Sequence, residues 1–304
     1  MKFENIQIYN FEGALRGMRN PKNSWDLSDS TFGIVKLDNN CGLETARLWA
    51  DATLAKKPDL KLSEDDMTKD YALWLWRNGI LQVDENKAFG EVAFIGPKDM
   101  KLAQTLIRAG SEHRKFMRQI FVTVDITAPL YWWKEFDTYK IGTVANSTST
   151  MHKIMAKEIT LESFEIDDYT NVPYEQDKQS KELEHPIEEN FVPMCLIPYL
   201  EYLRSSYMDM ESALQQQDIP ESTQKKLKEQ QRILWKELIR WLPESWLQTR
   251  TVTMDYENLL AICSKGQRRF HKLTEWSGPG NSFIKFARRL PYAQELIFLD
   301  EIEE

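Results

Sequence analysis

The chain has 304 residues, 42% of them hydrophobic, which is enough to bury one large core or two small ones. Its formal charge of −8 argues against a protein that coats nucleic acid, although a local cluster of arginine and lysine could still bind a small anion. No stretch approaches the roughly 20 apolar residues that span a bilayer, and the N-terminus lacks the apolar core of a signal peptide.

The cysteine content points to a reducing compartment. The three cysteines, Cys41, Cys195 and Cys263, are widely spaced and odd in number, which argues against a disulfide framework. The four histidines are far apart in the sequence, so we expect no metal site. We therefore predict a soluble cytoplasmic protein.

The first 95 residues carry few strong signals. Phe3, Ile6 and Ile8 indicate a short edge strand, and a turn is expected at Met18 to Pro21. Helices are expected at about residues 43–55 and 65–77. This part is predicted to be an N-terminal extension packed on a core of residues 96–304.

From Pro97 the pattern is sharper. Asp99 is expected to cap a helix that Gly110 closes. Alternating apolar residues from Ile120 to Ile126 then predict a strand with two distinct faces. Thr127 is expected to cap an aromatic-rich helix that has Pro129 in its first turn.

After residue 152 a charged stretch precedes further helices, and a helical insertion is expected at about residues 156–231. Asp218 and Glu221 resemble a capping box, followed by a core-facing stripe that includes Leu238 and Trp241. A strand is expected from Thr249 to Asp255, and a helix with a basic end from Asn258 to Trp276.

Three polar segments could carry chemistry, and each could instead be a solvated surface. The first is Ser111-Glu112-His113 after a helix end, and the second is the run Tyr139 to His152, rich in hydroxyl and amide groups suited to phosphate or heterocycle edges. The third places Asn258, Gln267-Arg268-Arg269 and His271 on one helix, where arginines suit bidentate phosphate binding.

In this order, the segments resemble the flavin-dependent thymidylate synthases. Glu112-His113, followed by a strand and then Ile126-Thr127-Ala128-Pro129-Leu130-Tyr131, is similar to that family's core. When the family signature R-H-R-x-x-S-x-N-E-x-S-x-R-Y is started at Tyr139, Asn146 and Ser149 match its central Asn and later Ser. Leu242-Pro243, Asn258, Arg269 and Trp276 follow with the family's order and spacing. The similarity covers roughly residues 97–155 and 232–276.

The resemblance implies an α+β fold in which helices flank an antiparallel sheet, and a homo-oligomer with sites between subunits. It implies a pyrimidine (deoxyuridine-type) nucleotide as ligand, no nucleic-acid polymer and no membrane. FAD is the implied cofactor, with a reduced folate and NADPH as further candidates. The site residues that it implies are grouped by role: Lys140 and Arg269 for catalysis; Tyr139, Asn146, Ser147, Ser149 and Arg269 for substrate; Glu112, His113 and Asn258 for cofactor.

This sequence also departs from the family signature at one important place. Tyr139-Lys140-Ile141 replaces the R-H-R triplet, which removes two guanidinium groups whose charge-assisted hydrogen bonds are each worth roughly 1.5–3 kcal/mol. Three hypotheses therefore stand: a flavin-dependent enzyme with an altered one-carbon transfer to a pyrimidine nucleotide, a binding or structural homologue without catalysis, and a nucleotide-modifying enzyme without flavin.

Overall fold

The structure is a computed structural model that describes residues 1–36, 81–83, 89–150, 154–166, 191–216 and 219–302. The helices expected at residues 43–55 and 65–77 lie outside these ranges. The chain divides into two compact units: unit 1 comprises Met1, Thr127–Asp137 and Ser147–Arg250, and unit 2 comprises Lys2–Ile126, Thr138–Asn146 and Thr251–Glu304. The boundary predicted near residue 95 and the insertion predicted at residues 156–231 stay predictions.

The central element is a four-stranded antiparallel sheet flanked by helices, which confirms the predicted α+β class. Its strand order is β1-β5-β7-β6, and its strands are β1 (Lys2–Tyr9), β5 (Phe121–Pro129), β7 (Leu247–Asp255) and β6 (Val144–Ser147). The strands expected at Phe3 to Ile8, Ile120 to Ile126 and Thr249 to Asp255 are thus confirmed.

The alternation in β5 produces one buried face. Val122, Val124, Ile126 and Ala128 are all fully buried, while Thr123 lies on the opposite, half-buried face and shares a hydrogen bond of 3.0 Å with the Thr253 hydroxyl. The strand continues to Pro129, which is itself the N-cap of α6 (Leu130–Phe136). The prediction that Thr127 caps this helix was therefore wrong, because the period-two pattern continues past it.

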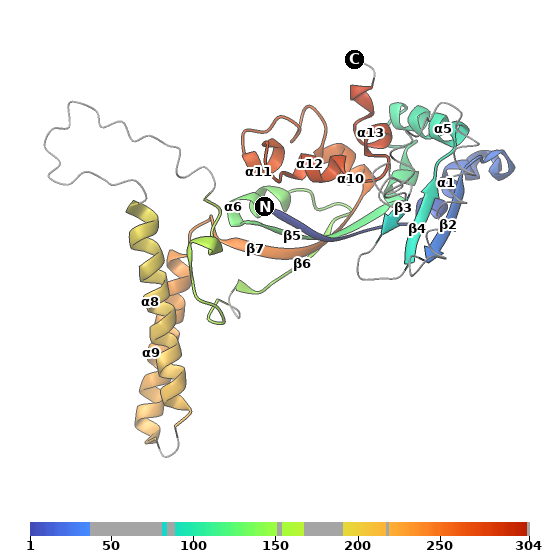
Figure 1. The fold of residues 1–304 in the computed structure, drawn as a ribbon. Helices are drawn as coiled ribbons and strands as arrows, with labels where there is room; N and C mark the ends of the chain where they lie inside the picture. The colour runs from blue at the N-terminus through green and yellow to red at the C-terminus, as the bar shows by residue number, and fades with distance from the viewer. Residues whose placement is uncertain (37–80, 84–88, 151–153, 167–190, 217–218, 303–304) are drawn as a thin grey trace, which may run out of the picture. The chain divides into compact units, whose positions relative to one another are not determined.

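Unit 2 contains a second, three-stranded antiparallel sheet and most of the short helices (Figure 1). The sheet has the order β2-β4-β3, with β2 (Thr31–Lys36), β4 (Phe89–Phe94) and β3 (Leu81–Val83). The helices are α1 (Phe11–Arg19), α5 (Pro97–Arg108), α10 (Tyr256–Ile262), α11 (Thr274–Ser277), α12 (Phe283–Arg288) and α13 (Ala293–Leu296). Large aromatic side chains fill the core of this unit: Phe11, Tyr256, Trp276, Phe283 and Phe298.

The start of α5 corrects one sequence expectation. Asp99 does not cap the helix, because Gly96 is the N-cap and the Asp29 carboxylate accepts the amide N–H groups of Lys98 and Asp99. Asp99 is instead fully buried, where it accepts a hydrogen bond from Arg19 Nε. Gly110 follows the end of α5 with φ of +106°, as predicted for a helix stop.

The turn expected at Met18 to Pro21 is the end of α1, which runs to Arg19 and is followed by a 3-10 turn, Asn20–Lys22.

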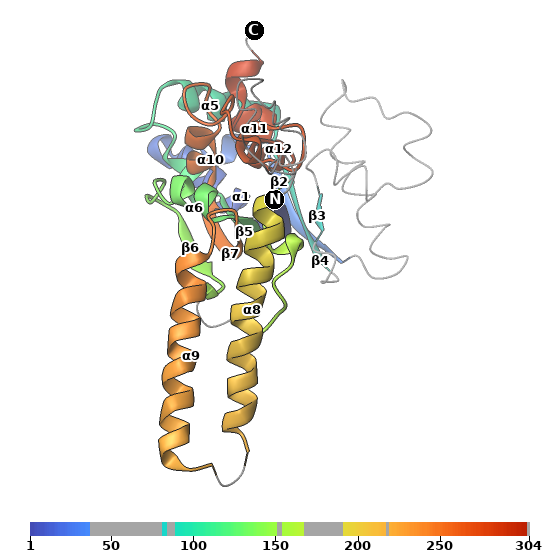
Figure 2. The same ribbon diagram turned by 90° about the vertical axis from the view of Figure 1, so that its left-hand side faces the viewer.

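In unit 1 the helices α8 (Phe191–Leu214) and α9 (Glu221–Trp241) lie side by side as a hairpin (Figures 1 and 2). A small core joins one end of this hairpin to the segment at residues 154–166. Its buried members are Ile154, Ile159, Phe164, Leu200, Leu203 and Leu238.

Two expectations about α9 were wrong. Its N-cap is Pro220, and Asp218 lies outside the described residues, so the expected capping box is not the start of this helix. Leu238 is fully buried as predicted, whereas the Trp241 ring is 56% exposed and donates to Glu237 Oε1 at 2.7 Å. The side of α9 that faces the small core is formed by Leu234, Leu238 and Ile239, and Trp241 is not part of it.

The helix expected from Asn258 to Trp276 is the largest correction. α10 ends at Ile262, and the next eleven residues are turns and irregular backbone before α11 begins at Thr274. Ser264 and Gly266 are poor helix formers, and the Arg268 amide N–H donates back to the Ile262 carbonyl. The basic residues after position 264 therefore lie in a turn region and do not share a helix with Asn258.

Candidate functional site

Tyr139 joins two segments of unit 2 that are far apart in the sequence. Its hydroxyl accepts a hydrogen bond from Arg268 Nε at 3.0 Å and donates one to Gln267 Oε1 at 3.3 Å. The Arg268 guanidinium also lies over the Trp276 ring, 4.8 Å from its centroid. Because Trp276 is fully buried and Tyr139 and Arg268 are half-buried, the arrangement presents a cation and a phenol at the surface of an aromatic core.

A second connection holds the loop after Tyr139 against the start of α10. Asn258 Nδ2 donates to the Ile141 carbonyl at 2.6 Å, and its Oδ1 accepts the Asp255 amide N–H at 3.1 Å. The Asp255 carboxylate in turn accepts the Asn258 amide N–H at 2.8 Å, which completes a reciprocal cap at the helix start. Asn258 therefore positions the loop and uses both ends of its amide to do so.

Gly142 permits this close approach. Its φ is +77°, and a Cβ at this position would lie 2.8 Å from Asp255 Oδ2 and 2.9 Å from Asn258 Oδ1. Burial raises the pKa of the Asp255 carboxyl, because desolvation disfavours the charged form more than the helix-start N–H groups favour it. We refer to Tyr139, Ile141, Gly142, Asn258 and Arg268 as the loop–helix cluster.

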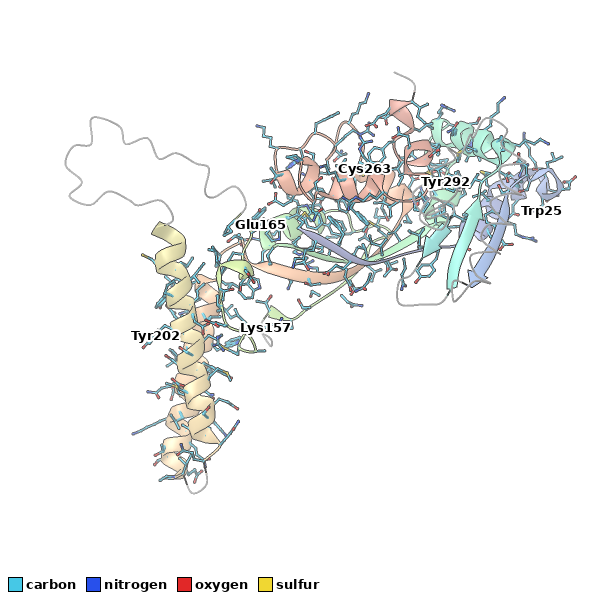
Figure 3. All side chains as sticks on the ribbon, in the orientation of Figure 1. Trp25, Lys157, Glu165, Tyr202, Cys263 and Tyr292 are labelled. Atoms are coloured by element: carbon cyan, nitrogen blue, oxygen red, sulfur yellow. The ribbon has the colours of Figure 1, made fainter. Side chains whose placement is uncertain are left out.

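Arg269, predicted to hold the nucleotide, lies outside this cluster. It is 4% exposed, and its Nη1 and Nη2 donate to the two carboxylate oxygens of Asp300, both at 2.8 Å. Its Nε donates to the Cys263 carbonyl at 2.7 Å (Cys263 is labelled in Figure 3). In this structure its guanidinium is bound to the protein's own C-terminal turn, and its role in binding a ligand stays a prediction.

Glu112 and His113 lie in an exposed turn after α5. The His113 amide N–H donates to the Gly110 carbonyl, and the Glu112 carboxylate pairs with Lys115 at 3.3 Å. The neighbouring Arg114 donates to both carboxylate oxygens of Glu257 on α10, each at 2.9 Å. This ion pair ties the Glu112-His113 turn to the helix that carries Asn258.

The remaining predicted site residues are exposed. Lys140 and Asn146 are exposed in unit 2, and Ser147 and Ser149 are exposed in unit 1. His152, at the end of the polar run, lies outside the described residues. The structure thus brings Tyr139 and the loop after it to Asn258, and it does not place Arg269 with them.

Arg268 is the residue that sequence reasoning did not single out. It stood inside the Gln267-Arg268-Arg269 group, but spacing along one chain cannot say which of two adjacent arginines contacts Tyr139. Tyr139 and Trp276 were both noted from the sequence, yet their approach to each other, with ring centroids 6.3 Å apart, is a tertiary contact.

The described residues were also searched for metal-binding groups, disulfides and membrane-spanning helices. No group of three or more His, Cys, Asp or Glu side chains in the described ranges is placed to hold a metal ion. Cys263 is buried and Cys195 exposed, and both are free thiols. None of the described helices is long and apolar enough to cross a bilayer.

Comparisons with known proteins gave matches among solved structures alone. No family model matches the chain, and neither does any curated protein. A flavin-dependent thymidylate synthase from Helicobacter pylori, complexed with FAD and dUMP, is 16% identical over 67% of this chain and 84% of its own, with a TM-score of 0.40. Another structure of that organism's thymidylate synthase X, also with FAD and dUMP, is 12% identical over 100% of both chains, with a TM-score of 0.47.

A UMP/dUMP methylase from Streptomyces cacaoi, bound to 5-bromo-UMP, is 14% identical over 67% of this chain and 83% of its own, with a TM-score of 0.39. These similarities are too distant to carry an argument about chemistry, which must come from the site itself.

Proposed function

We propose that this protein binds a pyrimidine nucleotide of the deoxyuridine type and acts on it in a flavin-dependent one-carbon transfer with an altered active site. The observation that supports this proposal is the loop–helix cluster. The signature-like run that begins at Tyr139 and the downstream segment from Asn258 to Trp276 resemble one family in the order and spacing of their residues. The contacts of Tyr139 with Arg268, and of Ile141 with Asn258, join these segments within one compact unit.

The cluster suits a planar, anionic ligand. Arg268 offers a guanidinium beside the partly exposed Tyr139 ring, so a base can stack on the phenol while a phosphate meets the cation. Lys140 adds a second, exposed positive charge one residue away. Asn146, which lies in the same unit, is proposed to supply its amide to the same ligand, and Ser147 and Ser149 stay predicted substrate contacts. For Arg269 to bind the phosphate of the ligand, its guanidinium must first release the Asp300 carboxylate.

Of the three residues proposed to contact the flavin, two have side chains available for hydrogen bonds to a cofactor and one does not. The exposed Glu112 carboxylate and His113 imidazole can bond to the polar groups of a cofactor, whereas the amide of Asn258 is already used inside the protein. When bound, a reduced flavin would supply hydride to the nucleotide. Within this chain, Asn258 holds the loop after Tyr139 in place. Arg268 and Lys140 are proposed to bind the negatively charged phosphate of the nucleotide. A reduced folate and NADPH are proposed as co-substrates through the family resemblance alone.

One observation favours a second candidate, a homologue that binds a ligand without catalysis. The Asp300 carboxylate already accepts hydrogen bonds from the Arg269 guanidinium, as a bound anion would. In addition, Tyr139 and Ile141 stand where the family signature has its two arginines. Such a protein would keep the loop–helix cluster and lack turnover.

An absorbance spectrum of freshly purified protein, followed by titration with FAD, FMN and dUMP, tests the proposal. We expect flavin absorbance or saturable flavin binding, and dUMP binding that weakens in Arg268→Ala. Colourless protein that binds neither flavin would refute the flavin-dependent function. Nucleotide binding at full affinity in flavin-free protein would favour an enzyme without flavin, and binding of both ligands without turnover would favour the non-catalytic homologue.

A further inference from the structure

Two loops of unit 2 carry the most exposed large apolar side chains of the described residues. The first loop comprises residues 138–146 and the second residues 264–273, and we refer to them together as the loop pair. Ile141 is 90% exposed, Phe270 is 74% exposed and Val144 is 66% exposed. Single exposed apolar side chains are common on protein surfaces, but a group of them marks a surface that another molecule covers.

The loop pair contains no acidic residue, although the chain as a whole has a formal charge of −8. Its basic residues are Lys140, Lys265, Arg268, Arg269 and Lys272. The Arg269 charge is neutralised by Asp300, whereas the three lysines are exposed and Arg268 is half-buried. Four positive charges therefore remain on these two short segments, where they favour an anionic partner.

Hydrogen bonds of one tyrosine hold the two loops together. The Tyr139 hydroxyl accepts from Arg268 Nε at 3.0 Å and donates to Gln267 Oε1 at 3.3 Å, which joins the first loop to the second. Ile141 follows Tyr139 by two residues, so their Cα atoms are at most about 8 Å apart. The same limit holds for Phe270, which follows Arg268 by two residues. The apolar side chains and the cations thus belong to one surface around the contact of Tyr139 with Arg268.

The order of apolar and basic residues indicates which anionic partner fits. Phe270 stands two residues from both Arg268 and Lys272, and Ile141 directly follows Lys140. An unpaired strand of nucleic acid is complementary to this order, because bases with apolar faces alternate with charged phosphates along it. An anionic lipid surface is complementary to a different order, in which apolar side chains gather on one face and cations on the other. A single nucleic-acid strand is therefore the partner that the loop pair fits.

We propose that the loop pair binds a single-stranded nucleic acid, with one base stacked on the Phe270 ring and phosphates at the lysines. This inference replaces the expectation, drawn from the family resemblance, that no nucleic-acid polymer binds. It rests on the proposed function in one respect, because the pyrimidine at the loop–helix cluster is then one unit of a strand. A mononucleotide has one base and one phosphate, fewer groups than the apolar side chains and cations of the loop pair can contact.

Fluorescence anisotropy of the full-length chain with a labelled deoxyuridine strand of about 12 nucleotides tests the proposal, since single-strand sites cover lengths of this order. We expect the strand to bind at least about tenfold more tightly than dUMP, measured by competition, because it meets several cations at once. The logarithm of the affinity should fall with the logarithm of the salt concentration with a slope of about −2 to −3, as four neutralised phosphates imply. A duplex of the same length should bind more weakly, because its bases are not free to stack. A uridine strand of the same length shows whether RNA or DNA is preferred.

Matched variants test the two kinds of contact separately. Phe270→Ala should weaken strand binding at least about fivefold, as for the loss of one stacked base, and Phe270→Trp should retain it. Lys265→Gln with Lys272→Gln should make the salt slope shallower by about 1.4, the value for two phosphates. The controls are Phe121→Ala and Lys98→Gln, an exposed phenylalanine and an exposed lysine of unit 2 outside the loop pair. If Phe270→Ala does not fold, as judged by circular dichroism, Phe270→Leu takes its place.

No strand binding, equal strand affinity of Phe270→Ala and Phe121→Ala, or equal affinity for duplex and single strand would overturn the proposal. Binding to phosphatidylserine vesicles without strand binding would overturn it in favour of a membrane surface. A changed sedimenting mass of Phe270→Ala with unchanged strand binding would overturn it in favour of a protein contact. Failure of the proposed function is read separately, from the flavin and dUMP titrations: strand binding by a protein that binds no flavin supports the present inference, and dUMP binding without strand binding refutes it alone.

Discussion

Arg269 and Asp300 form a bidentate ion pair, in which Nη1 and Nη2 of the buried guanidinium each donate to one carboxylate oxygen at 2.8 Å. A third donor of the same guanidinium, Nε, bonds to the Cys263 carbonyl, and the group lies 5.2 Å from the centroid of the Phe298 ring. One side chain thus fastens the end of the chain to the turn after α10.

The first prediction concerns this fastening. Asp300→Asn should lower the free energy of unfolding by about 1–2 kcal/mol, a value reduced from that of a buried charged hydrogen bond because Asp300 is 46% exposed. Arg269→Met should cost more, since it also leaves the Cys263 carbonyl without this donor. Urea denaturation measures both, with Asp26→Asn at an exposed position as the control. Equal stability of Asp300→Asn and the control would contradict the structural role.

The second prediction separates the two adjacent arginines. Arg268→Ala should weaken dUMP binding by roughly tenfold or more, as expected for losing a charge-assisted contact of about 1.5–3 kcal/mol. It should lower the free energy of unfolding less than Arg269→Ala does, because Arg268 is half-buried and Arg269 is 4% exposed. Arg269→Ala should show the opposite pattern, a clear loss of stability. Calorimetric titration and thermal unfolding of both variants measure the contrast. Undiminished dUMP affinity in Arg268→Ala would exclude the guanidinium at Tyr139 as the phosphate contact.

The third prediction compares three glycines. Gly142→Ala should destabilise the protein most, by about 2 kcal/mol or more, because the left-handed φ and the crowding by Asp255 and Asn258 act together. Gly110→Ala has a left-handed φ of +106° but open space, so its cost should be smaller. Gly266→Ala has neither feature and should be close to neutral. Thermal unfolding that ranked Gly266 with Gly142 would refute the close approach of the loop to α10.

The fourth prediction concerns pH. The Arg288 guanidinium, which donates to both carboxylate oxygens of Glu301 at 2.7 and 2.8 Å, lowers the pKa of that carboxyl below its ordinary value of 4.5. The folded state therefore holds the proton less tightly than the unfolded state. The resulting stabilisation is complete above pH 4.5 and is lost as the pH falls through the lowered pKa.

Glu301→Gln should accordingly destabilise the protein at neutral pH and approach wild-type stability in acid. Added salt should shrink the difference, because the Arg288 side chain is 39% exposed. Urea titrations at several pH values measure the effect, with Glu4→Gln on an exposed position of β1 as the control. A difference between Glu301→Gln and wild type that stayed constant down to acid pH would contradict the assignment to Arg288.

The amino-acid sequence by itself determined the elements whose signal is local. The alternation from Ile120 to Ile126 gave β5 and its buried face, and Gly110 marked the end of α5, because periodicity and left-handed φ depend on neighbouring residues alone. The family resemblance of the runs after Tyr139 and Asn258 also predicted that they lie together, and Asn258 Nδ2 does bond to the Ile141 carbonyl.

Tertiary structure decided which partner each polar side chain meets. Asp99 looked like a helix cap but is buried against Arg19, 80 positions away. Arg269, which is predicted to bind phosphate, pairs in this structure with Asp300, 31 positions away. The neighbouring Arg268 turns to Tyr139 instead. Such choices depend on which segments the fold brings together, because a charged group that becomes buried must find a partner of opposite charge wherever the fold places one.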